Sequence, residues 1–168
     1  MLLPQSPPGM LHAAMPVRHW LMKSEPEVFS IDDLAKLKGQ TTFWDGVRNY
    51  QARNLLRDDM KPGDLVLFYH SNAKPPAAAG VAEVVKAARP DPTQFDSKSD
   101  HFDPTAKESE PRWYGVEIKY RSKFKQVVSL EAIKAVPALS KMILINRSRL
   151  SVQPVTQEEF KTIVKLGG

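Results

Sequence analysis

The segment from Trp44 to Asn54 carries more polar groups than folding alone requires. An aromatic ring precedes an Asp-Gly turn, and Asn49 and Arg53 then fall four residues apart on one helical face. A helix that starts beside a Gly turn exposes unpaired N–H donors, which suit a phosphate. A tryptophan with flanking cations can stack on an unpaired base. The spacing leaves a second interpretation open, in which Trp44 belongs to the core and the arginines are solvated.

A second concentration of charge lies further along the chain, where cations recur at every second position. They are Lys119, Arg121, Lys123 and Lys125. On a strand they are expected on one face, in a row of about 20 Å at about 3.3 Å per residue. Such a row can contact phosphates, or it can protect an edge strand from aggregation. The sequence does not choose between these two interpretations.

Other common chemistries find no support in the residue pattern. The four histidines lack a metal-ligand spacing such as H-E-x-x-H, so no metal site is predicted. The chain has no glycine-rich phosphate loop and no G-x-S-x-G elbow, and we expect no cofactor. Lys23, Ser24 and Glu25 place an amine, a hydroxyl and a carboxylate side by side. Neighbours along a strand point to opposite faces, however, so Lys23 and Ser24 are not expected to meet directly.

The composition bounds the class of protein. The 168 residues are 42% apolar, which is enough for one domain with a core and too few for two. Cysteine is absent, which excludes disulfides and thiolate chemistry and predicts a reducing, cytoplasmic location. No apolar run approaches the ~20 residues that span a bilayer, so no membrane partner is expected. Lys and Arg outnumber Asp and Glu by 24 to 19, a surplus that favours a polyanionic partner.

The chain divides into a leader and a body. Residues 1–18 contain four prolines and no acidic residue, and the prolines interrupt every candidate signal-peptide segment. We predict that residues 1–18 are a disordered leader and that residues 19–168 form one domain. Met10 or Met15 can equally be the start codon.

The body predicts an α+β fold. Strands are expected over residues 19–23, 42–44, 65–70, 79–87, 113–125 and 150–153, and helices over 31–37, 48–58, 129–134 and from 156 onward. Ser30 with Asp33 and Thr156 with Glu159 form capping boxes. The alternation after Trp113 indicates an antiparallel strand, and no regular βαβ pattern appears. The prediction is a mixed, curled β-sheet or barrel of about five or six strands with short peripheral helices.

Two local features of the body carry their own expectations. Gly80, inside a predicted strand, indicates a bulge or a close backbone approach. Residues 88–111 hold four prolines and six acids, and they predict a long surface loop of the kind that is often functional.

Several motifs, taken together in chain order, carry a resemblance. They are WLMKSEP at 20–26, FWDGVRNYQARN at 43–54, FYHSN at 68–72, GVAEV at 80–84 and WY at 113–114. With these motifs the chain closely resembles the EVE domain family of small PUA-like proteins, from about His19 to Leu166.

This resemblance implies a barrel-like mixed sheet and kinship with the RNA-binding YTH and ASCH domains. In YTH domains a Lys-Ser strand end and a following Trp help to form an aromatic pocket for a methylated base. The similar positions here are Lys23, Ser24 and Trp44. The family is linked to modified bases in DNA, especially modified cytosine, and it is not established as enzymatic.

Together, the residues and the resemblance predict a non-catalytic nucleic-acid-binding module with one base-sized pocket. The expected base pocket consists of Ser24, Trp44, Asn49, Tyr69, His70 and Ser71. The expected phosphate-binding residues are Lys23, Arg48 and Arg53. The predicted partner is DNA or RNA with a modified base, and the chain is expected to be a monomer.

Two alternatives remain at this stage. A small-molecule or protein-interaction module would show a shallow apolar patch at Trp44 in place of a deep pocket. A hydrolytic enzyme acting on nucleic acid would use His70 as acid or base beside Ser24 or Lys23, within hydrogen-bond reach.

Overall fold

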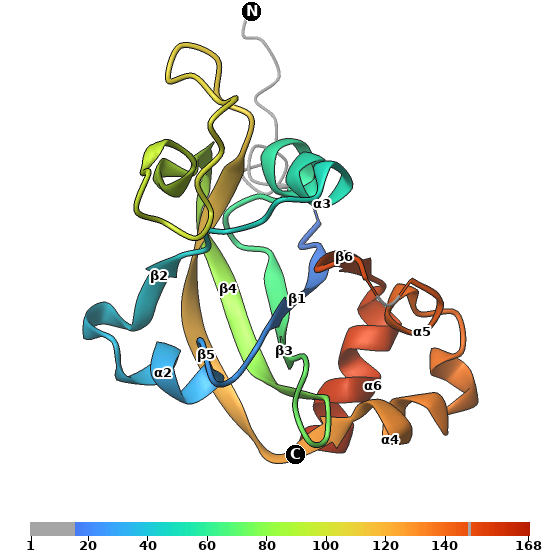
Figure 1. The fold of residues 1–168 in the computed structure, drawn as a ribbon. Helices are drawn as coiled ribbons and strands as arrows, with labels where there is room; N and C mark the ends of the chain where they lie inside the picture. The colour runs from blue at the N-terminus through green and yellow to red at the C-terminus, as the bar shows by residue number, and fades with distance from the viewer. Residues whose placement is uncertain (1–15, 148) are drawn as a thin grey trace, which may run out of the picture.

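A six-stranded mixed sheet forms the centre of the computed structural model, which describes residues 16–147 and 149–168 (Figure 1). Its strands are β1 (His19–Ser24), β2 (Thr41–Phe43), β3 (Leu65–His70), β4 (Ala77–Pro90), β5 (Tyr114–Ser129) and β6 (Val152–Val155). They lie in the order β2-β5-β4-β3-β1-β6, with β1 parallel to β3 and the other neighbours antiparallel. The predicted α+β fold is confirmed, and the sheet stays open at β2 and β6 and does not close into a barrel.

Short helices surround the sheet. They are α2 (Ile31–Lys36), α3 (Tyr50–Asn54), α4 (Leu130–Lys134), α5 (Ile143–Asn146) and α6 (Gln157–Gly167), with 3-10 turns η1 (Lys38–Gln40), η3 (Pro92–Phe95) and η4 (Pro137–Leu139) and the π-helical turn η2 (Leu55–Asp59). In Figure 1, α4, α5 and α6 gather on one side of the sheet and α2 lies on the other. The two capping boxes predicted at Ser30 and Thr156 are confirmed.

Both faces of the sheet are buried, each against its own hydrophobic cluster. Strand alternation sends Trp20 and Met22 into one cluster and Leu21 into the other, as the sequence predicts. The first cluster includes Phe68 of β3 and Trp44 beyond β2, whereas the second includes Phe160 of α6. The first cluster lies beneath the candidate site described below.

A bulge in β5 overturns the predicted row of four cations. Tyr120 pairs with Ala82 and Ser122 pairs with Val81, so β5 advances two residues while β4 advances one. The extra residue reverses the side-chain alternation, which places Ile118 in the first cluster and Phe124 in the second. The cations before and after the bulge therefore do not share one face.

Two of these four cations form ion pairs with acidic side chains. Arg121 pairs with Glu83 at 3.3 Å, and Lys123 pairs with Asp32 at 2.9 Å. The strand itself lies inside the sheet between β2 and β4, although β2 covers only its first part. Neither the phosphate row nor a simple charged edge strand describes β5.

Gly80 sits beside this bulge, and its lack of a side chain is required. A Cβ there would overlap the backbone carbonyl oxygen of Ser122. The pairing of β4 with β5 also shifts register between Ala78 and Gly80. Both features expected of Gly80, a bulge and a close backbone approach, are confirmed.

The body of the domain begins before His19. The backbone N–H of Arg18 donates to Asp64 Oδ1 at 3.1 Å, and the Arg18 guanidinium lies 4.7 Å from the centroid of the Trp20 ring. Asp64 also accepts the indole N–H of Trp20 at 2.9 Å. Residues 1–15 of the predicted leader lie outside the described residues.

Candidate functional site

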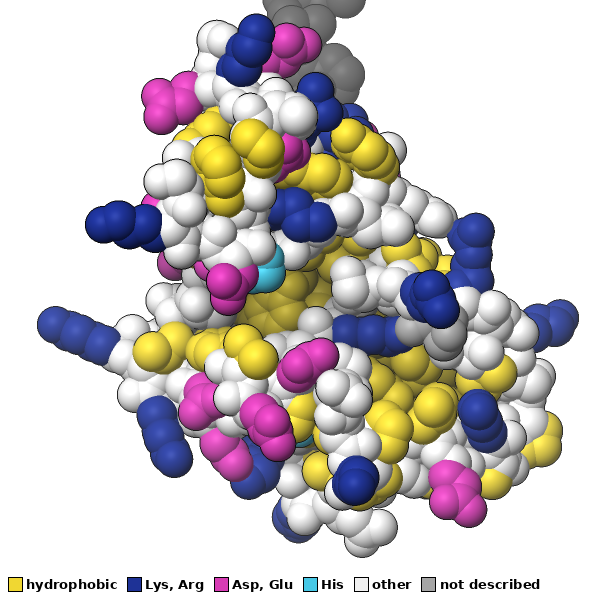
Figure 2. Space-filling view, viewed as in Figure 1, with side chains coloured by type: hydrophobic (Ala, Val, Ile, Leu, Met, Phe, Trp, Pro, Cys, Tyr) yellow, Lys and Arg dark blue, Asp and Glu magenta, His cyan; other side chains and the backbone are white. Residues whose placement is uncertain are grey.

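A cleft of about 680 Å³, here called the central cleft, opens where β1 ends, beside β2 and the start of α3. Five predicted site residues line it: Lys23, Ser24, Trp44, Arg48 and Asn49. Its other lining residues are Glu25, Val28, Phe29, Thr42, Phe43, Asp45, Gly46, Val47, His101 and Ser151. Figure 2 shows a hollow with a hydrophobic floor and Lys and Arg side chains beside it. The cleft falls within the usual volume range of ligand pockets, about 300–1,000 Å³.

Trp44 belongs to both the cleft and the core. Only 8% of the residue is exposed, and its ring meets Phe68 edge-on at 5.5 Å and Phe29 at 6.4 Å between centroids. Its backbone N–H donates to the carbonyl of Val116 at 2.8 Å, which continues the pairing of β2 with β5. This packing fixes the ring. Of the two interpretations that the spacing left open, the core therefore accounts for most of the Trp44 side chain, which also lines the cleft.

Ser24 and Asn49 each use one side-chain polar atom in a local hydrogen bond. The Ser24 hydroxyl donates to the carbonyl of Phe29 at 2.6 Å, which closes the turn after β1. The Asn49 side-chain oxygen accepts the N–H of Ala52 at 2.9 Å and so caps α3. This cap explains why the helix starts at Tyr50 and not at Arg48. The amide NH₂ of Asn49 is left with the capacity to donate to a ligand.

Arg48 holds the 91–113 segment against the cleft. Its guanidinium donates five hydrogen bonds. Nε and Nη2 both donate to the carbonyl of His101, Nη1 donates to the carbonyl of Val47 and to Asp91 Oδ2, and Nη2 also donates to Thr93 Oγ1. A guanidinium has five N–H donors, so all of them are engaged. The phosphate contact predicted for Arg48 therefore finds no free donor in this arrangement.

Asp91 is the buried anchor of this network. Its side chain is fully buried and accepts hydrogen bonds from the N–H of Gly46 at 2.8 Å, from Nη1 of Arg48 at 3.0 Å and from the N–H and hydroxyl of Thr93. Burial by itself raises the pKa of Asp91, but the hydrogen bonds from Thr93, Gly46 and Arg48 lower the pKa below its ordinary value. The carboxylate stays charged and ties the cleft to the 91–113 segment.

The rest of the 91–113 segment is ordered by further polar contacts. Gln94 is fully buried and bonds the backbone of Asp91, Arg112 and Trp113. The indole N–H of Trp113 donates to Asp103 at 2.7 Å. Hydrogen bonds from Thr105 and Trp113 lower the pKa of Asp103 to about 2. The predicted surface loop is therefore a fixed wall beside the cleft.

His101, at the tip of this segment, closes over Gly46. Gly46 has a φ of +81°, and a Cβ there would lie 2.7 Å from Nε2 of His101. Only glycine combines this backbone conformation with the close approach of the ring. The sequence marks Asp45-Gly46 as a turn, but it gives no sign that His101 packs on it.

Four predicted site residues do not line the central cleft among the described parts of the chain. They are Arg53, Tyr69, His70 and Ser71. Tyr69 is 2% exposed in the second hydrophobic cluster, on the face of the sheet opposite Phe68, and burial raises its pKa to about 12. The prediction that β3 contributes its end to the cleft overlooked that Tyr69 and Trp44 belong to opposite faces.

His70 and Arg53 have structural partners of their own. Nε2 of His70 accepts the backbone N–H of Ile31 at 3.1 Å, and burial lowers the pKa of this imidazole. The Arg53 guanidinium lies 4.8 Å from the Tyr50 ring centroid and donates to the carbonyl of Arg112 at 2.9 Å. Both side chains stabilise the elements that frame the site.

Lys23 remains at the cleft. Partial burial lowers the pKa of its ammonium. Its backbone N–H donates to the carbonyl of Ser151 at 2.9 Å, and Ser151 also lines the cleft. Exposed Arg147 and Arg149 lie shortly before Ser151 in the chain. This basic segment was missed from the sequence, where nothing marks its proximity to β1.

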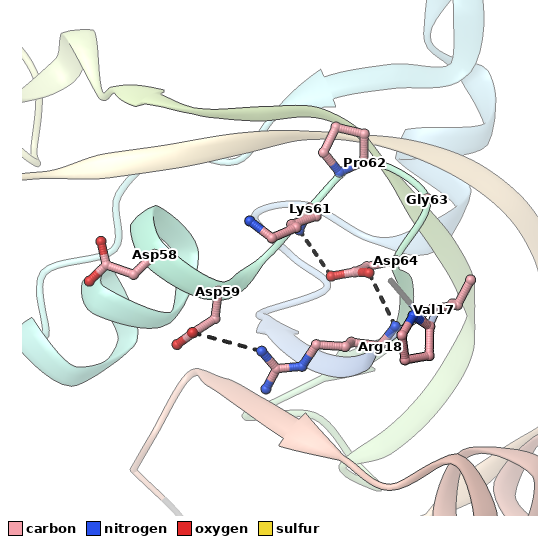
Figure 3. Close-up of a pocket in the computed structure, with 9 residues that line it drawn as sticks. Val17, Arg18, Asp58, Asp59, Lys61, Pro62, Gly63 and Asp64 are labelled. Atoms are coloured by element: carbon pink, nitrogen blue, oxygen red, sulfur yellow. Dashed lines mark hydrogen bonds and ion pairs between the residues drawn. The ribbon is translucent and has the colours of Figure 1, made fainter. Parts of the chain in front are cut away.

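A second pocket, of about 660 Å³, lies at the start of the described chain (Figure 3). It is lined by Pro16, Val17, Arg18, Asp58, Asp59, Lys61, Pro62, Gly63 and Asp64. Arg18 forms an ion pair with Asp59 at 3.7 Å, and the Asp64 carboxylate accepts the backbone N–H of Lys61 at 2.9 Å. No predicted site residue lines it.

Two searches of the described residues bear on other functions. Within residues 16–147 and 149–168, no group of three or more metal-ligating side chains could hold a metal ion. No helix in that part of the chain is long and apolar enough to cross a membrane.

Comparison with known proteins decides the family. The family model described as EVE domain matches residues 18–166. The chain belongs to the EVE domain family. Thymocyte nuclear protein 1 of Homo sapiens is 46% identical over 165 residues, covering 88% of this chain and 73% of the human protein. The uncharacterized protein C21.03c of Schizosaccharomyces pombe is 37% identical, covering 89% of this chain and 68% of the yeast protein.

Solved structures of EVE relatives share the PUA-like fold. A hypothetical protein from Leishmania major has a TM-score of 0.86 at 48% identity, covering 90% of this chain and 94% of that one. Human THYN1 protein in complex with 5-methylcytosine containing DNA has a TM-score of 0.85 at 46% identity, covering 89% of this chain and 97% of that one. An ASCH protein from Zymomonas mobilis has a TM-score of 0.52 at 11% identity and shares the fold alone.

Proposed function

We propose that this EVE domain is a non-catalytic nucleic-acid-binding module that accepts one base, preferably a modified cytosine, in the central cleft. The observation that carries the proposal is the cleft itself, about 680 Å³ in volume, with the fixed ring of Trp44 in its lining. Human THYN1, 46% identical, has been crystallised with DNA that contains 5-methylcytosine. The net charge of +5 favours the same class of partner.

The cleft offers distinct groups to a nucleotide. Trp44 provides a rigid apolar surface, and the Asn49 amide can donate to a base or a phosphate. Lys23 supplies positive charge from the end of β1, and Arg147 and Arg149 extend that charge along the neighbouring segment. Val28, 76% exposed at the cleft, adds an apolar contact outside the core.

The alternatives fit the geometry less well. A hydrolytic enzyme needs His70 beside a nucleophile, but His70 Nε2 already accepts the N–H of Ile31 and the Ser24 hydroxyl donates to Phe29. A protein-interaction module would present a shallow apolar patch, whereas Trp44 lines a cleft that also carries carboxylate, amide and ammonium groups. The matched relatives from vertebrates are called nuclear proteins, which lends no support to the predicted cytoplasmic location.

Fluorescence anisotropy with labelled DNA duplexes tests the proposal. Two duplexes of one sequence, with 5-methylcytosine or cytosine at one position, are titrated with the protein at several salt concentrations. We expect tighter binding to the methylated duplex, and binding that weakens as salt rises because phosphate contacts release counterions. Lys23→Met should reduce the slope of log affinity against log salt by about one phosphate contact. Lys125→Met, in β5 and away from the cleft lining, should leave this slope unchanged. Binding that ignores both salt and methylation would overturn the proposal.

A further inference from the structure

The polar side chains of the central cleft differ in what they have left to offer a ligand. The Arg48 donors are all engaged, the Ser24 hydroxyl donates to Phe29, and the Asn49 oxygen caps α3. The Asp45 carboxylate is exposed at the cleft, and no described side chain donates a hydrogen bond to it. Asp45 follows Trp44 in the chain and lines the same cleft, so its carboxylate is an available acceptor there among the described residues.

The surroundings of Asp45 affect how readily its carboxylate stays charged and accepts a hydrogen bond. Partial burial raises the pKa of Asp45, and the nearby Asp91 carboxylate adds to this rise, while His101 and Arg48 oppose it. Lys23 and Glu25 line the same cleft. The Arg48 guanidinium pairs with Asp91, and it acts on Asp45, as His101 does, through its charge. A hydrogen bond donated by a ligand offsets the partial desolvation of the Asp45 carboxylate.

Cytosine and thymine differ at two neighbouring positions of the base edge, since cytosine N3 is an acceptor whereas thymine N3 carries a hydrogen, and position 4 also differs. Cytosine carries an N4 amino donor at the position where thymine carries the O4 acceptor, and carboxylates accept from cytosine N4. Thymine and 5-methylcytosine share the same methyl group at C5, so a pocket that senses only that methyl group accepts both bases. An acceptor that faces the amino position discriminates between them, because only the cytosine-type base can donate to it.

We propose that Asp45 is the residue that selects cytosine-type bases over thymine, by accepting a hydrogen bond from the exocyclic amino group of a base whose ring lies against Trp44. The proposal rests on the proposed nucleic-acid function and adds the chemical feature of the base that is recognised. A thymine at the same place would set its O4 against the carboxylate, and two acceptors without a proton between them repel one another. In this arrangement the methyl group of the base adds affinity, and its amino group distinguishes cytosine-type bases from thymine.

The test compares two duplexes of one sequence, which carry a 5-methylcytosine–guanine or a thymine–adenine pair at the same position. Affinities for both are measured for the wild type, Asp45→Asn, Asp45→Ser and Glu25→Gln. Glu25 is also an exposed carboxylate of the cleft, and it accepts a 3.5 Å hydrogen bond from the side chain of Asn72. Glu25→Gln therefore controls for the general gain in DNA affinity when a negative charge is removed. Melting temperatures of all four proteins confirm that they fold.

We expect the wild type to favour 5-methylcytosine over thymine, and both Asp45 variants to lose about tenfold of that ratio, while Glu25→Gln keeps it. An unchanged ratio in the Asp45 variants, or an equal loss in Glu25→Gln, would overturn the assignment of Asp45 and leave the proposed function standing. A wild type that binds neither duplex would overturn the proposed function, and the inference with it.

Discussion

The buried carboxylate of Asp91 lies 3.0 Å from Nη1 of Arg48, a residue 43 positions earlier in the chain. This ion pair joins the helix-start segment that follows Trp44 to the 91–113 segment. The same carboxylate accepts the N–H of Gly46, so two residues of the segment after Trp44 are bound to one anion. The cleft keeps its shape because this contact and its neighbours are satisfied within the protein.

Removing the guanidinium should therefore destabilise the fold. Arg48→Met leaves the buried Asp91 charge without its cation, which should lower the free energy of unfolding by about 3 kcal/mol. Arg57 forms an exposed pair with Asp58 at 2.8 Å, so Arg57→Met should cost about 0–1 kcal/mol. Urea unfolding of both variants measures the difference. Equal effects would mean that the Arg48–Asp91 pair does not hold the cleft together.

Substitutions of Trp44 should affect stability as well as DNA binding, because the side chain belongs to the core and also lines the cleft. Trp44→Ala removes a side chain packed on Phe68 and Phe29, and it should cost about 3–5 kcal/mol of stability. Trp44→Phe keeps most of the packing and so provides the variant for binding measurements. Thermal unfolding and DNA titration of both proteins test this expectation. A Trp44→Ala protein as stable as the wild type would remove Trp44 from the core.

Motif and periodicity predict those parts of the molecule in which neighbours in the chain determine the outcome. The strands and the capping boxes belong to this class. The grouping of Lys23, Ser24, Trp44 and Asn49 at one cleft was expected from the family resemblance, because these residues are not neighbours in the chain. The alternation of Trp20 and Leu21 between two clusters does follow from neighbours in the chain.

The features that the sequence did not predict depend on pairing between distant segments. One extra residue at the β5 bulge reverses the facing of the side chains that follow it, and although Gly80 indicates a bulge, the alternation within β5 does not show where the register shifts. From the sequence, Arg48 is expected to bind phosphate, but in the structure Asp91 and the His101 carbonyl accept hydrogen bonds from its guanidinium. Tyr69 is a different case, because strand alternation alone already assigns Phe68 and Tyr69 to opposite faces of the sheet.

Gly46 should be sensitive in binding as well as in stability. Gly46→Ala forces a side chain into a φ of +81° and against the His101 ring, whereas Gly63→Ala meets a φ of +96° with nothing within 4 Å. Both variants should lose about 1–2 kcal/mol of stability to the left-handed backbone. Only Gly46→Ala should also weaken DNA binding, because His101 must move. Matching DNA affinities for the two variants would contradict a role for the contact of His101 with Gly46.

Acid should release the 91–113 segment through Asp103. The pKa of Asp103 is depressed to about 2 in the folded protein, so its contribution to stability is complete above the ordinary pKa of an aspartate and is lost as the pH falls toward 2. Asp103→Asn should remove this contribution at neutral pH and flatten the acid dependence. Unfolding curves recorded between pH 2 and 7 provide the measurement. An unchanged acid profile in the variant would show that Asp103 does not hold Trp113.

The pH should also control base selection. Since the pKa of Asp45 is raised, the carboxylate becomes protonated at a higher pH than an ordinary aspartate. A protonated Asp45 loses its strength as an acceptor, so the preference for 5-methylcytosine over thymine should fall as the pH decreases. The ratio of the two affinities, measured across a pH series, should stay flat in Asp45→Asn. A pH dependence that persists in this variant would place the titrating group elsewhere.

The most direct test of the central claim is an NMR titration of ¹⁵N-labelled protein with a duplex that contains 5-methylcytosine. We expect the largest shift changes at amides that line the central cleft, in Glu25, Gly46 and Asn49, and at the Trp44 indole. The amides of Lys61 and Gly63, at the second pocket, should change little. Changes centred on the second pocket, or no localised changes at saturating DNA, would contradict the claim that the central cleft is the nucleic-acid site.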